Sequence, residues 1–109
     1  MSDIDDQLRN VLETAYAYLN RRDRTTHELR EHLRKQVSDT AVAARAIGVL
    51  QEQGYLDDAR YARLFAEDKR TLEDWGGERI RRALEARGVA RELIDDALTA
   101  AAGESVRRQ

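Results

Sequence analysis

Residues 54–65 read GYLDDARYARLF, and this stretch separates two segments that repeat the same pattern of apolar residues. A glycine followed by an aromatic residue, at the end of a helical pattern, is typical of a left-handed C-terminal cap with its hydrophobic contact. An aspartate shortly after it suits the N-terminus of the next helix, both as a cap and through the macrodipole. The stretch therefore predicts that one helix ends at Gly54 and that the next begins at Asp57.

Three helical patterns precede this stretch. The first runs from about Gln7 to Arg21, with apolar residues at steps of three and four that form one stripe. Thr25 and Glu28 have the spacing of a capping box, which predicts a second helix that runs to about residue 36. Asp39 can cap a third helix.

Three more helical patterns follow it. We expect the helix that Asp57 opens to bury one face, formed by Tyr61, Ala62, Phe65 and Leu72. The chain breaks at residues 75–77, continues as a helix over 78–87, and turns at Gly88 much as it does at Gly54. A sixth helix fades by Gly103. We expect Trp75 to close the base of this second set, the alternative being an exposed anchor for a partner or a stacking surface for a base.

A shift of 51 residues aligns the apolar positions of the two halves of the sequence. It pairs Leu29 with Ile80, Leu33 with Leu84, Val42 with Leu93 and Ile47 with Leu98. With no proline and few β-branched runs, the sequence predicts an all-α fold of two tandem three-helix repeats forming one elongated helical domain. We place the first repeat at residues 1–56, the second at 57–103 and a C-terminal tail at 104–109, which could begin an absent third repeat.

The composition excludes several classes of protein. The 109 residues contain no cysteine, so disulfide frameworks and thiolate chemistry are excluded. No apolar run approaches the roughly 18 residues of a membrane helix, and no secretory signal follows the acidic start. We therefore expect a cytoplasmic protein that is not associated with a membrane.

Catalytic and metal-binding patterns are weak. His27 and His32 are five residues apart, so their imidazoles point about 140° apart around a helix and cannot share a metal ion as an i, i+4 pair can. No serine has a nucleophile-elbow setting, and Gly76-Gly77 lacks the strand and the lysine of a phosphate loop. We expect no enzymatic activity, no metal and no cofactor.

The cations are unevenly placed although the net charge is only −2. Residues 21–35 hold six cations against three acids, and residues 79–91 hold five against one. One interpretation is a solvated face with the pairs Glu31–Lys35, Glu78–Arg82 and Arg81–Glu85. The other is a surface for a polyanionic or acidic partner. The residues that we predict to bind such a partner are Arg30, Arg34, Lys35, Arg79, Arg81, Arg82 and Arg87.

Residues 15–19 (AYAYL), 22–25 (RDRT) and 54–65, followed by Gly77, Ile80, Leu84 and Gly88, resemble the RecX family of recombinase regulators. The resemblance covers about residues 12–98. It implies tandem three-helix repeats and a protein that binds the RecA recombinase, chiefly its filament on single-stranded DNA. It also implies limits on the ATPase, strand-exchange and coprotease activities of RecA in DNA repair, recombination and the SOS response. The family usually has three repeats, whereas this chain has two.

Two other functions remain open: a stand-alone DNA-binding module that uses the second or fifth helix for recognition, and an adaptor for another partner. The net charge favours at most weak direct contact with DNA. We expect a monomer. We also expect Tyr55, Asp57, Asp58, Tyr61 and Phe65 to set the angle between the repeats rather than to bind a partner.

Overall fold

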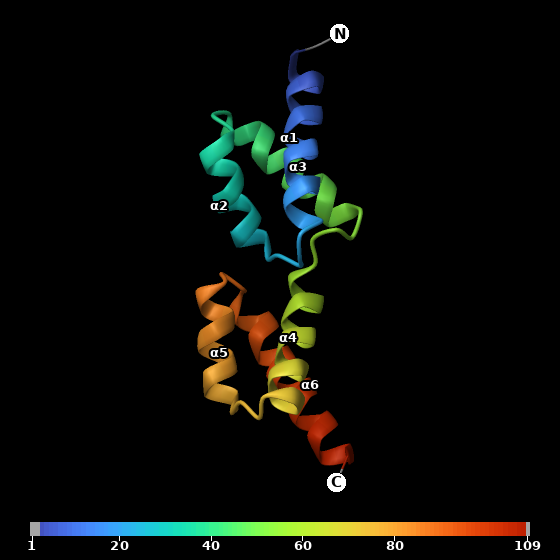
Figure 1. The fold of residues 1–109 in the computed structure, drawn as a ribbon, viewed down its shortest axis with the longest axis vertical. Helices are drawn as coiled ribbons and strands as arrows, with labels where there is room; N and C mark the ends of the chain where they lie inside the picture. The colour runs from blue at the N-terminus through green and yellow to red at the C-terminus, as the bar shows by residue number, and fades with distance from the viewer. Residues whose placement is uncertain (1–2, 109) are drawn as a thin grey trace. The chain divides into compact units, whose positions relative to one another are not determined.

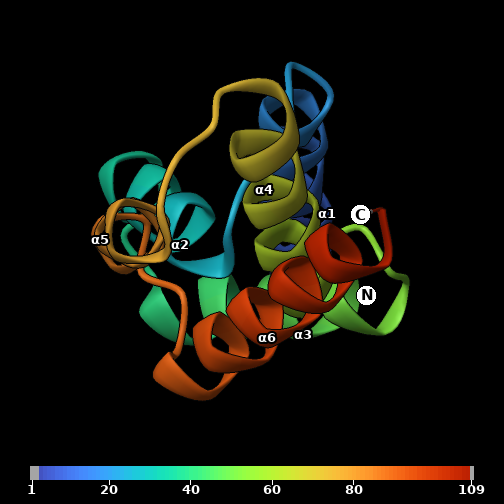
Figure 2. The ribbon, with the colours of Figure 1, turned by 90° about the horizontal axis from the view of Figure 1, so that it is seen from below.

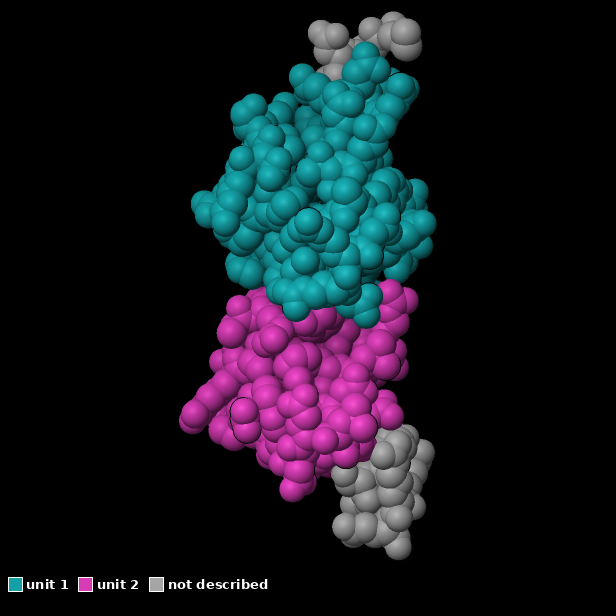
Figure 3. Space-filling view, in the orientation of Figure 1, with its two compact units in different colours: residues 1–57 teal, residues 58–109 magenta. Residues whose placement is uncertain are grey.

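The computed structural model describes the backbone of residues 3–108 and the side chains of residues 5–103, a range with six helices and no strand. The helices are α1 (Asp3–Leu19), α2 (Thr26–Gln36), α3 (Thr40–Glu52), α4 (Asp58–Leu72), α5 (Gly77–Ala86) and α6 (Arg91–Arg108) (Figure 1). They form two compact units, residues 1–57 and 58–109 (Figure 3). The all-α fold of two three-helix repeats is confirmed. The repeat boundaries stay predictions, and the side chains of the predicted tail 104–109 lie outside the described residues.

Two side-chain caps begin helices in the first unit. Thr25 Oγ1 accepts from Glu28 N at 3.2 Å while Glu28 Oε1 accepts from Thr25 N at 2.9 Å, so the predicted capping box is confirmed. Asp39 Oδ1 accepts from Ala41 N at 3.0 Å and from Val42 N at 3.3 Å. These bonds satisfy backbone donors that have no partner within their helix.

The first helix differs from the prediction at both ends. It begins at Asp3 rather than near Gln7, because carboxylates in a first turn favour the helix N-terminus. It ends at Leu19 rather than Arg21, because Arg21 N donates to Tyr18 O at 3.3 Å in a tighter final turn. Arg21 and the residues after it therefore belong to the connection between α1 and α2.

Two glycines end helices in the same way, as predicted. Gly54 has φ +81° and Gly88 has φ +78°, the left-handed region that costs other residues energy. In each case the N–H of the following residue donates to the carbonyl five residues back, which is the 6→1 bond of the Schellman pattern. These bonds join Tyr55 N to Leu50 O (2.9 Å) and Val89 N to Leu84 O (3.1 Å).

The turn between the second and third helix of each unit is built differently. Val37 stands where the 51-residue shift would place a counterpart of Gly88, and it ends α2 in an extended conformation with φ −128°. Asp39 caps α3, whereas its counterpart Ala90 has no side-chain acceptor to offer α6. The sequence repeat therefore preserves the core positions more closely than the chemistry of the turn.

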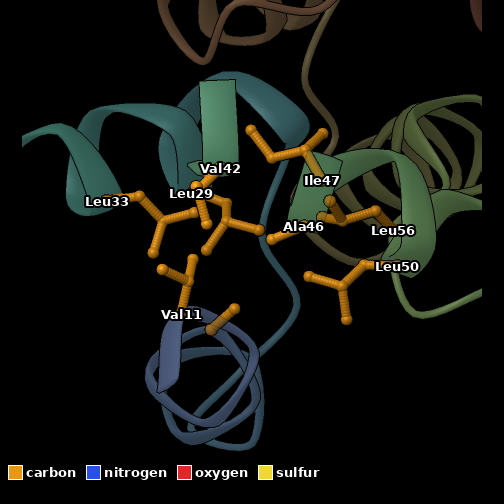
Figure 4. Close-up of a cluster of buried hydrophobic side chains, with 9 residues drawn as sticks. Val11, Leu29, Leu33, Val42, Ala46, Ile47, Leu50 and Leu56 are labelled. Carbon is orange, nitrogen blue, oxygen red and sulfur yellow. The ribbon is translucent and has the colours of Figure 1, made fainter. Parts of the chain in front are cut away.

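The core of the first unit contains residues from all three of its helices and from the segment after α3 (Figure 4). Its buried members are Val11, Ala15, Leu29, Leu33, Val42, Ala46, Ile47, Leu50 and Leu56. Leu29 and Leu33 lie one turn apart on α2 and are fully buried. This cluster fixes the direction in which the opposite, charged face of α2 points.

The core of the second unit is built from small residues where α4 packs on α6 (Figure 2). Its buried members are Ala62, Ala66, Ile80, Leu84, Val89, Ile94, Ala97 and Ala101. The prediction that Leu72 is buried is wrong, because its side chain is 78% exposed. Leu72 lies six residues after Ala66, which is about 240° around the helix and away from α6. Tyr61 and Phe65 are half-buried against this core.

The last helix is longer than predicted. We expected it to fade by Gly103, but α6 continues to Arg108. The run of alanines at residues 100–102 has high helix propensity, and one interior glycine costs only about 1 kcal/mol against it.

Candidate partner-binding surfaces

The three predicted binding cations of the first unit lie on the exposed side of α2. Arg34 donates to Glu31 at 2.8 Å. The predicted pair Glu31–Lys35 is therefore wrong, because Glu31 pairs with Arg34, the residue before Lys35. Arg30 and Lys35 are exposed and have no ion pair or hydrogen bond with any residue in the described part of the chain. Exposed guanidinium and ammonium groups without an acid nearby are available to an anionic partner.

Arg79 and Arg82 are the exposed members of the α5 set. The Arg79 guanidinium carbon lies 3.9 Å from the centre of the Trp75 ring, within cation–π distance. Arg82 contacts Glu78 at 3.6 Å, so the predicted i, i+4 pair is present, with both side chains at least 70% exposed. An ion pair this exposed is worth little, so it leaves Arg82 free to exchange partners.

Arg81 faces α6 instead of solvent. Its guanidinium donates to Asp95 Oδ1 at 2.7 Å, and this hydrogen bond is the main cause that raises the pKa of Arg81 above its ordinary value. The predicted pair Arg81–Glu85 is therefore wrong, because the packing of α5 on α6 brings Asp95 closer. Arg81 links two helices of the second unit.

Arg87 is turned back onto its own unit. It donates to the carbonyl of Ala83 at 2.9 Å in the last turn of α5, and its guanidinium lies 4.7 Å from the centre of the Phe65 ring on α4. A cation at this position satisfies a carbonyl left open at the helix end. The four arginines of the α5 set consequently point in different directions rather than forming one face.

Three aromatic rings and two cations of the second unit form what we call the Trp75 cluster: Tyr61, Phe65, Lys69, Trp75 and Arg79. The ring centres of Tyr61 and Phe65 are 6.1 Å apart, and those of Phe65 and Trp75 are also 6.1 Å apart. Trp75 packs against the core of this unit, as predicted. Lys69 was not predicted, although its position four residues after Phe65 on one helix is a usable signal. Its ammonium lies 4.8 Å from the Trp75 ring centre.

The first unit has a comparable arrangement, which we call the Tyr18 cluster: Tyr18, Arg21, Arg24, His32 and Lys35. The rings of Tyr18 and His32 stack with centres 3.9 Å apart and planes 9° apart, and the Arg24 guanidinium carbon lies 4.1 Å from the Tyr18 centre. Burial lowers the pKa of His32 below 6.5, and the charges of Arg24, Lys35 and Arg21 lower it further. Of these residues the prediction included only Lys35, because the connection between α1 and α2 has no periodic pattern.

The junction aromatic Tyr55 is 56% exposed, and its ring meets the edge of Tyr16 on α1 at 5.2 Å. Tyr16 in turn donates its hydroxyl to Gln53 Oε1 at 2.6 Å. These contacts join α1 to the segment after α3 within the first unit. A role of the junction residues in setting the angle between repeats stays a prediction.

Metal-binding and membrane-spanning features are absent from the part of the chain that the structure describes. No group of three or more histidine, aspartate or glutamate side chains there could hold a metal ion. No described helix combines the length and the apolar character needed to cross a bilayer. Among the exposed side chains of the two units are the cations Arg30, Lys35, Arg79 and Arg82.

Two three-helix units in tandem, each with cations on its second helix, define a helical-repeat binding protein as the class that fits this fold. Comparison with known proteins narrows that class. The profile described as "RecX, first three-helix domain" matches residues 12–50, and "RecX, second three-helix domain" matches residues 57–98. The chain belongs to the RecX family, as its resemblance in sequence indicated.

The relatives carry the name "Regulatory protein RecX". The one from Leuconostoc citreum is 34% identical over 94 residues, 86% of this chain and 35% of the relative. The one from Lactobacillus delbrueckii subsp. bulgaricus is 38% identical over 84 residues, 77% of this chain and 31% of the relative. The chain thus spans about a third of the length of these curated relatives.

Two crystal structures share the fold. RecX from Lactobacillus salivarius superposes with a TM-score of 0.84 at 23% identity, over 88% of this chain and 62% of that one. A structure described as regulatory protein RecX gives a TM-score of 0.82 at 25% identity, over 88% of this chain and 48% of that one. The all-α fold is therefore shared by proteins that are distant in sequence.

Proposed function

We propose that this chain binds the RecA recombinase, or its filament on single-stranded DNA, and inhibits RecA's ATPase, strand-exchange and coprotease activities. The observation that carries the proposal is the match of both units to successive RecX domains, over residues 12–50 and 57–98. The relatives' name as regulatory proteins supports a role in binding rather than in catalysis. The setting of this activity is DNA repair and the SOS response in the cytoplasm.

The contact is made by exposed cations on both units. Arg30 and Lys35 on α2, and Arg79 and Arg82 on α5, are exposed and have weak or no acid partners among the described residues. Arginine is suited to such contacts because its planar guanidinium binds carboxylates and phosphates through two parallel hydrogen bonds. Arg34 is paired with Glu31, and Arg81 and Arg87 contact their own unit, so we assign these three a supporting role.

The direct test of the function measures RecA ATPase activity on single-stranded DNA with increasing amounts of this chain. We expect the rate of ATP hydrolysis to fall as the chain is added, since a protein that limits the filament reduces the number of active RecA subunits. An unchanged rate at a large molar excess of the chain would contradict the proposal.

The surface is tested with the paired substitution Arg30→Gln and Lys35→Gln. We expect inhibition to need several-fold more protein, because each lost surface charge removes up to about 1 kcal/mol of attraction. Arg45→Gln is the matched control, an exposed arginine on α3 outside the proposed surface. Inhibition that is unaffected by the pair, or weakened equally by the control, would refute the assignment.

A stand-alone DNA-binding module is the second candidate, and the uncompensated charges of Arg30 and Lys35 favour it. Such a module would bind DNA without RecA, and its affinity would fall steeply with salt in proportion to the phosphates contacted. A salt titration of binding to free single-stranded DNA separates the two functions. Absence of binding at low salt, together with binding to RecA filaments, would exclude the DNA-binding module.

A further inference from the structure

The Tyr18 ring in the first unit is covered on both faces. The His32 imidazole lies parallel to one face at 3.9 Å, so the Arg24 guanidinium, 4.1 Å from the same centre, must occupy the other. This sandwich holds an arginine and a histidine at fixed positions around the end of α1. Stacking of this kind orients the polar edges of both groups without using their hydrogen bonds.

Positive charge gathers around the sandwich. Arg21 and Arg24 come from the connection after α1, and Lys35 lies one turn after His32 on α2; all three act electrostatically on His32. The nearby acids are engaged elsewhere: Glu28 in the capping box and Glu31 with Arg34. Within residues 5–103, Asp23 makes no ion pair with these cations.

One donor in the cluster is left without a partner. Arg24 Nε is buried and has no hydrogen-bond acceptor within the described part of the chain. A buried donor without an acceptor costs free energy. A shallow pocket of about 330 Å³ in the same cluster is lined by Thr14, Ala17, Tyr18, Arg21 and His32. The pocket thus combines space with the exposed Arg21 and the imidazole of His32, while Arg24 lies on the other face of the Tyr18 ring.

We propose that this pocket binds a tetrahedral oxyanion of the phosphate type, held by Arg21 and the edge of His32 with Arg24 and Lys35 behind them. Two or more cations around one small concave site are the usual requirement for holding a phosphate group in place. The proposal concerns the first unit alone and does not depend on binding to RecA. The phosphate is either free or part of a nucleic-acid backbone, and the experiment below distinguishes these sources.

Binding of the anion is coupled to a proton on His32. Without an anion, burial and the neighbouring charges of Arg24, Lys35 and Arg21 lower the pKa of His32, which favours the neutral imidazole. An anion in the pocket stabilises the protonated imidazole and therefore raises that pKa. By linkage, the anion must bind more tightly as the pH falls and His32 takes up its proton.

Nuclear magnetic resonance of the two histidines tests the proposal. Sulfate is the probe, since its charge stays constant across this pH range, and it replaces chloride at constant ionic strength. We expect sulfate to raise the pKa of His32 and to bind more tightly at about pH 6 than at about pH 8. The exposed His27, outside the pocket, reports any general effect of the salt. A His32 titration that sulfate does not move would overturn the proposal.

The matched variants are Arg21→Gln and Arg22→Gln, two exposed neighbours of which only Arg21 lines the pocket. Loss of one unit charge about 5 Å from a doubly charged anion should weaken sulfate binding about fifteenfold in Arg21→Gln at low ionic strength. Equal weakening in Arg22→Gln would overturn the site. An oligothymidylate that displaces sulfate identifies the nucleic-acid backbone as the source of the phosphate. One that leaves sulfate bound identifies free phosphate.

Discussion

At the scale of the residue, the most constrained backbone positions are the glycines that end α3 and α5. Gly54 has φ +81°, and a Cβ placed there meets no atom within 4 Å. The cost of a side chain at this position is therefore one of backbone conformation rather than of packing. A Cβ placed at Gly48 also meets no atom within 4 Å, and Gly48 lies inside α3 with an ordinary helical backbone.

Substitution of Gly54 and of Gly48 by alanine should change the stability of the protein in opposite directions. Gly54→Ala should destabilise the protein by about 1 kcal/mol, because alanine pays for the left-handed conformation. Gly48→Ala should stabilise it by about 0.5–1 kcal/mol, because alanine is the better helix former and has room. Urea denaturation measures both. A Gly54→Ala protein as stable as the wild type would contradict the Schellman cap described for α3.

His32 makes stability depend on pH. Its pKa in the folded chain is lower than the value of 6.5 taken for the unfolded chain, so the unfolded state binds the proton more readily. The contribution of His32 to stability is therefore complete above about pH 6.5 and declines as the pH falls from that value towards the lowered pKa.

We expect the free energy of unfolding to fall between about pH 7 and pH 5, and the substitution His32→Gln to flatten this part of the profile. Urea denaturation in sulfate-free buffers at several pH values measures the slope. A wild-type slope that persists in His32→Gln would show that another group is responsible.

At the scale of the element, each helix begins and ends through local chemistry that a sequence displays. The capping box at Thr25, the cap at Asp39 and the two glycine turns were all predicted, because each depends on residues only a few positions apart. Contacts between helices were not predicted. Arg81 pairs with Asp95, and His32 stacks on Tyr18. In both contacts the two residues are 14 positions apart in the sequence, so no local sequence pattern predicts them.

The same distinction explains the error at Leu72. Its residue type suits a core, but the face of α4 that becomes buried is decided by α6, which presents small alanines to Ala62 and Ala66. Of the candidate site, the sequence identified the helices that carry exposed cations. It did not separate Arg30 and Arg79, which face solvent, from Arg81 and Arg87, which contact their own unit.

The capping box at the start of α2 is the element whose loss should matter most to the first unit. Thr25→Ala removes the acceptor for Glu28 N and should destabilise the protein by about 1–2 kcal/mol, since Thr25 is fully buried. Thr71→Ala is the control, because its exposed hydroxyl only bonds back to Glu67 O within α4 and its loss should cost less than about 0.5 kcal/mol. Equal losses in the two variants, measured by thermal unfolding, would contradict a special role for the cap.

At the scale of the whole molecule, the internal repeat ties fold to function. Each unit buries its own core and presents cations on its second helix, and each holds an arginine against an aromatic ring: Arg24 on Tyr18 in the first unit and Arg79 on Trp75 in the second. The net charge of −2 conceals these local concentrations of positive charge. Local positive charge on a chain whose total charge is negative suits the proposed partner, a protein–DNA assembly, better than it suits naked DNA.

The central proposal is that this chain, which belongs to the RecX family, recognises RecA assembled on DNA. Its most direct test is co-sedimentation of the chain with RecA filaments on single-stranded DNA, beside free single-stranded DNA at the same salt concentration. The account predicts that the filaments retain the chain at a salt concentration at which free DNA retains none. Equal retention by both, or none by the filaments, would contradict it.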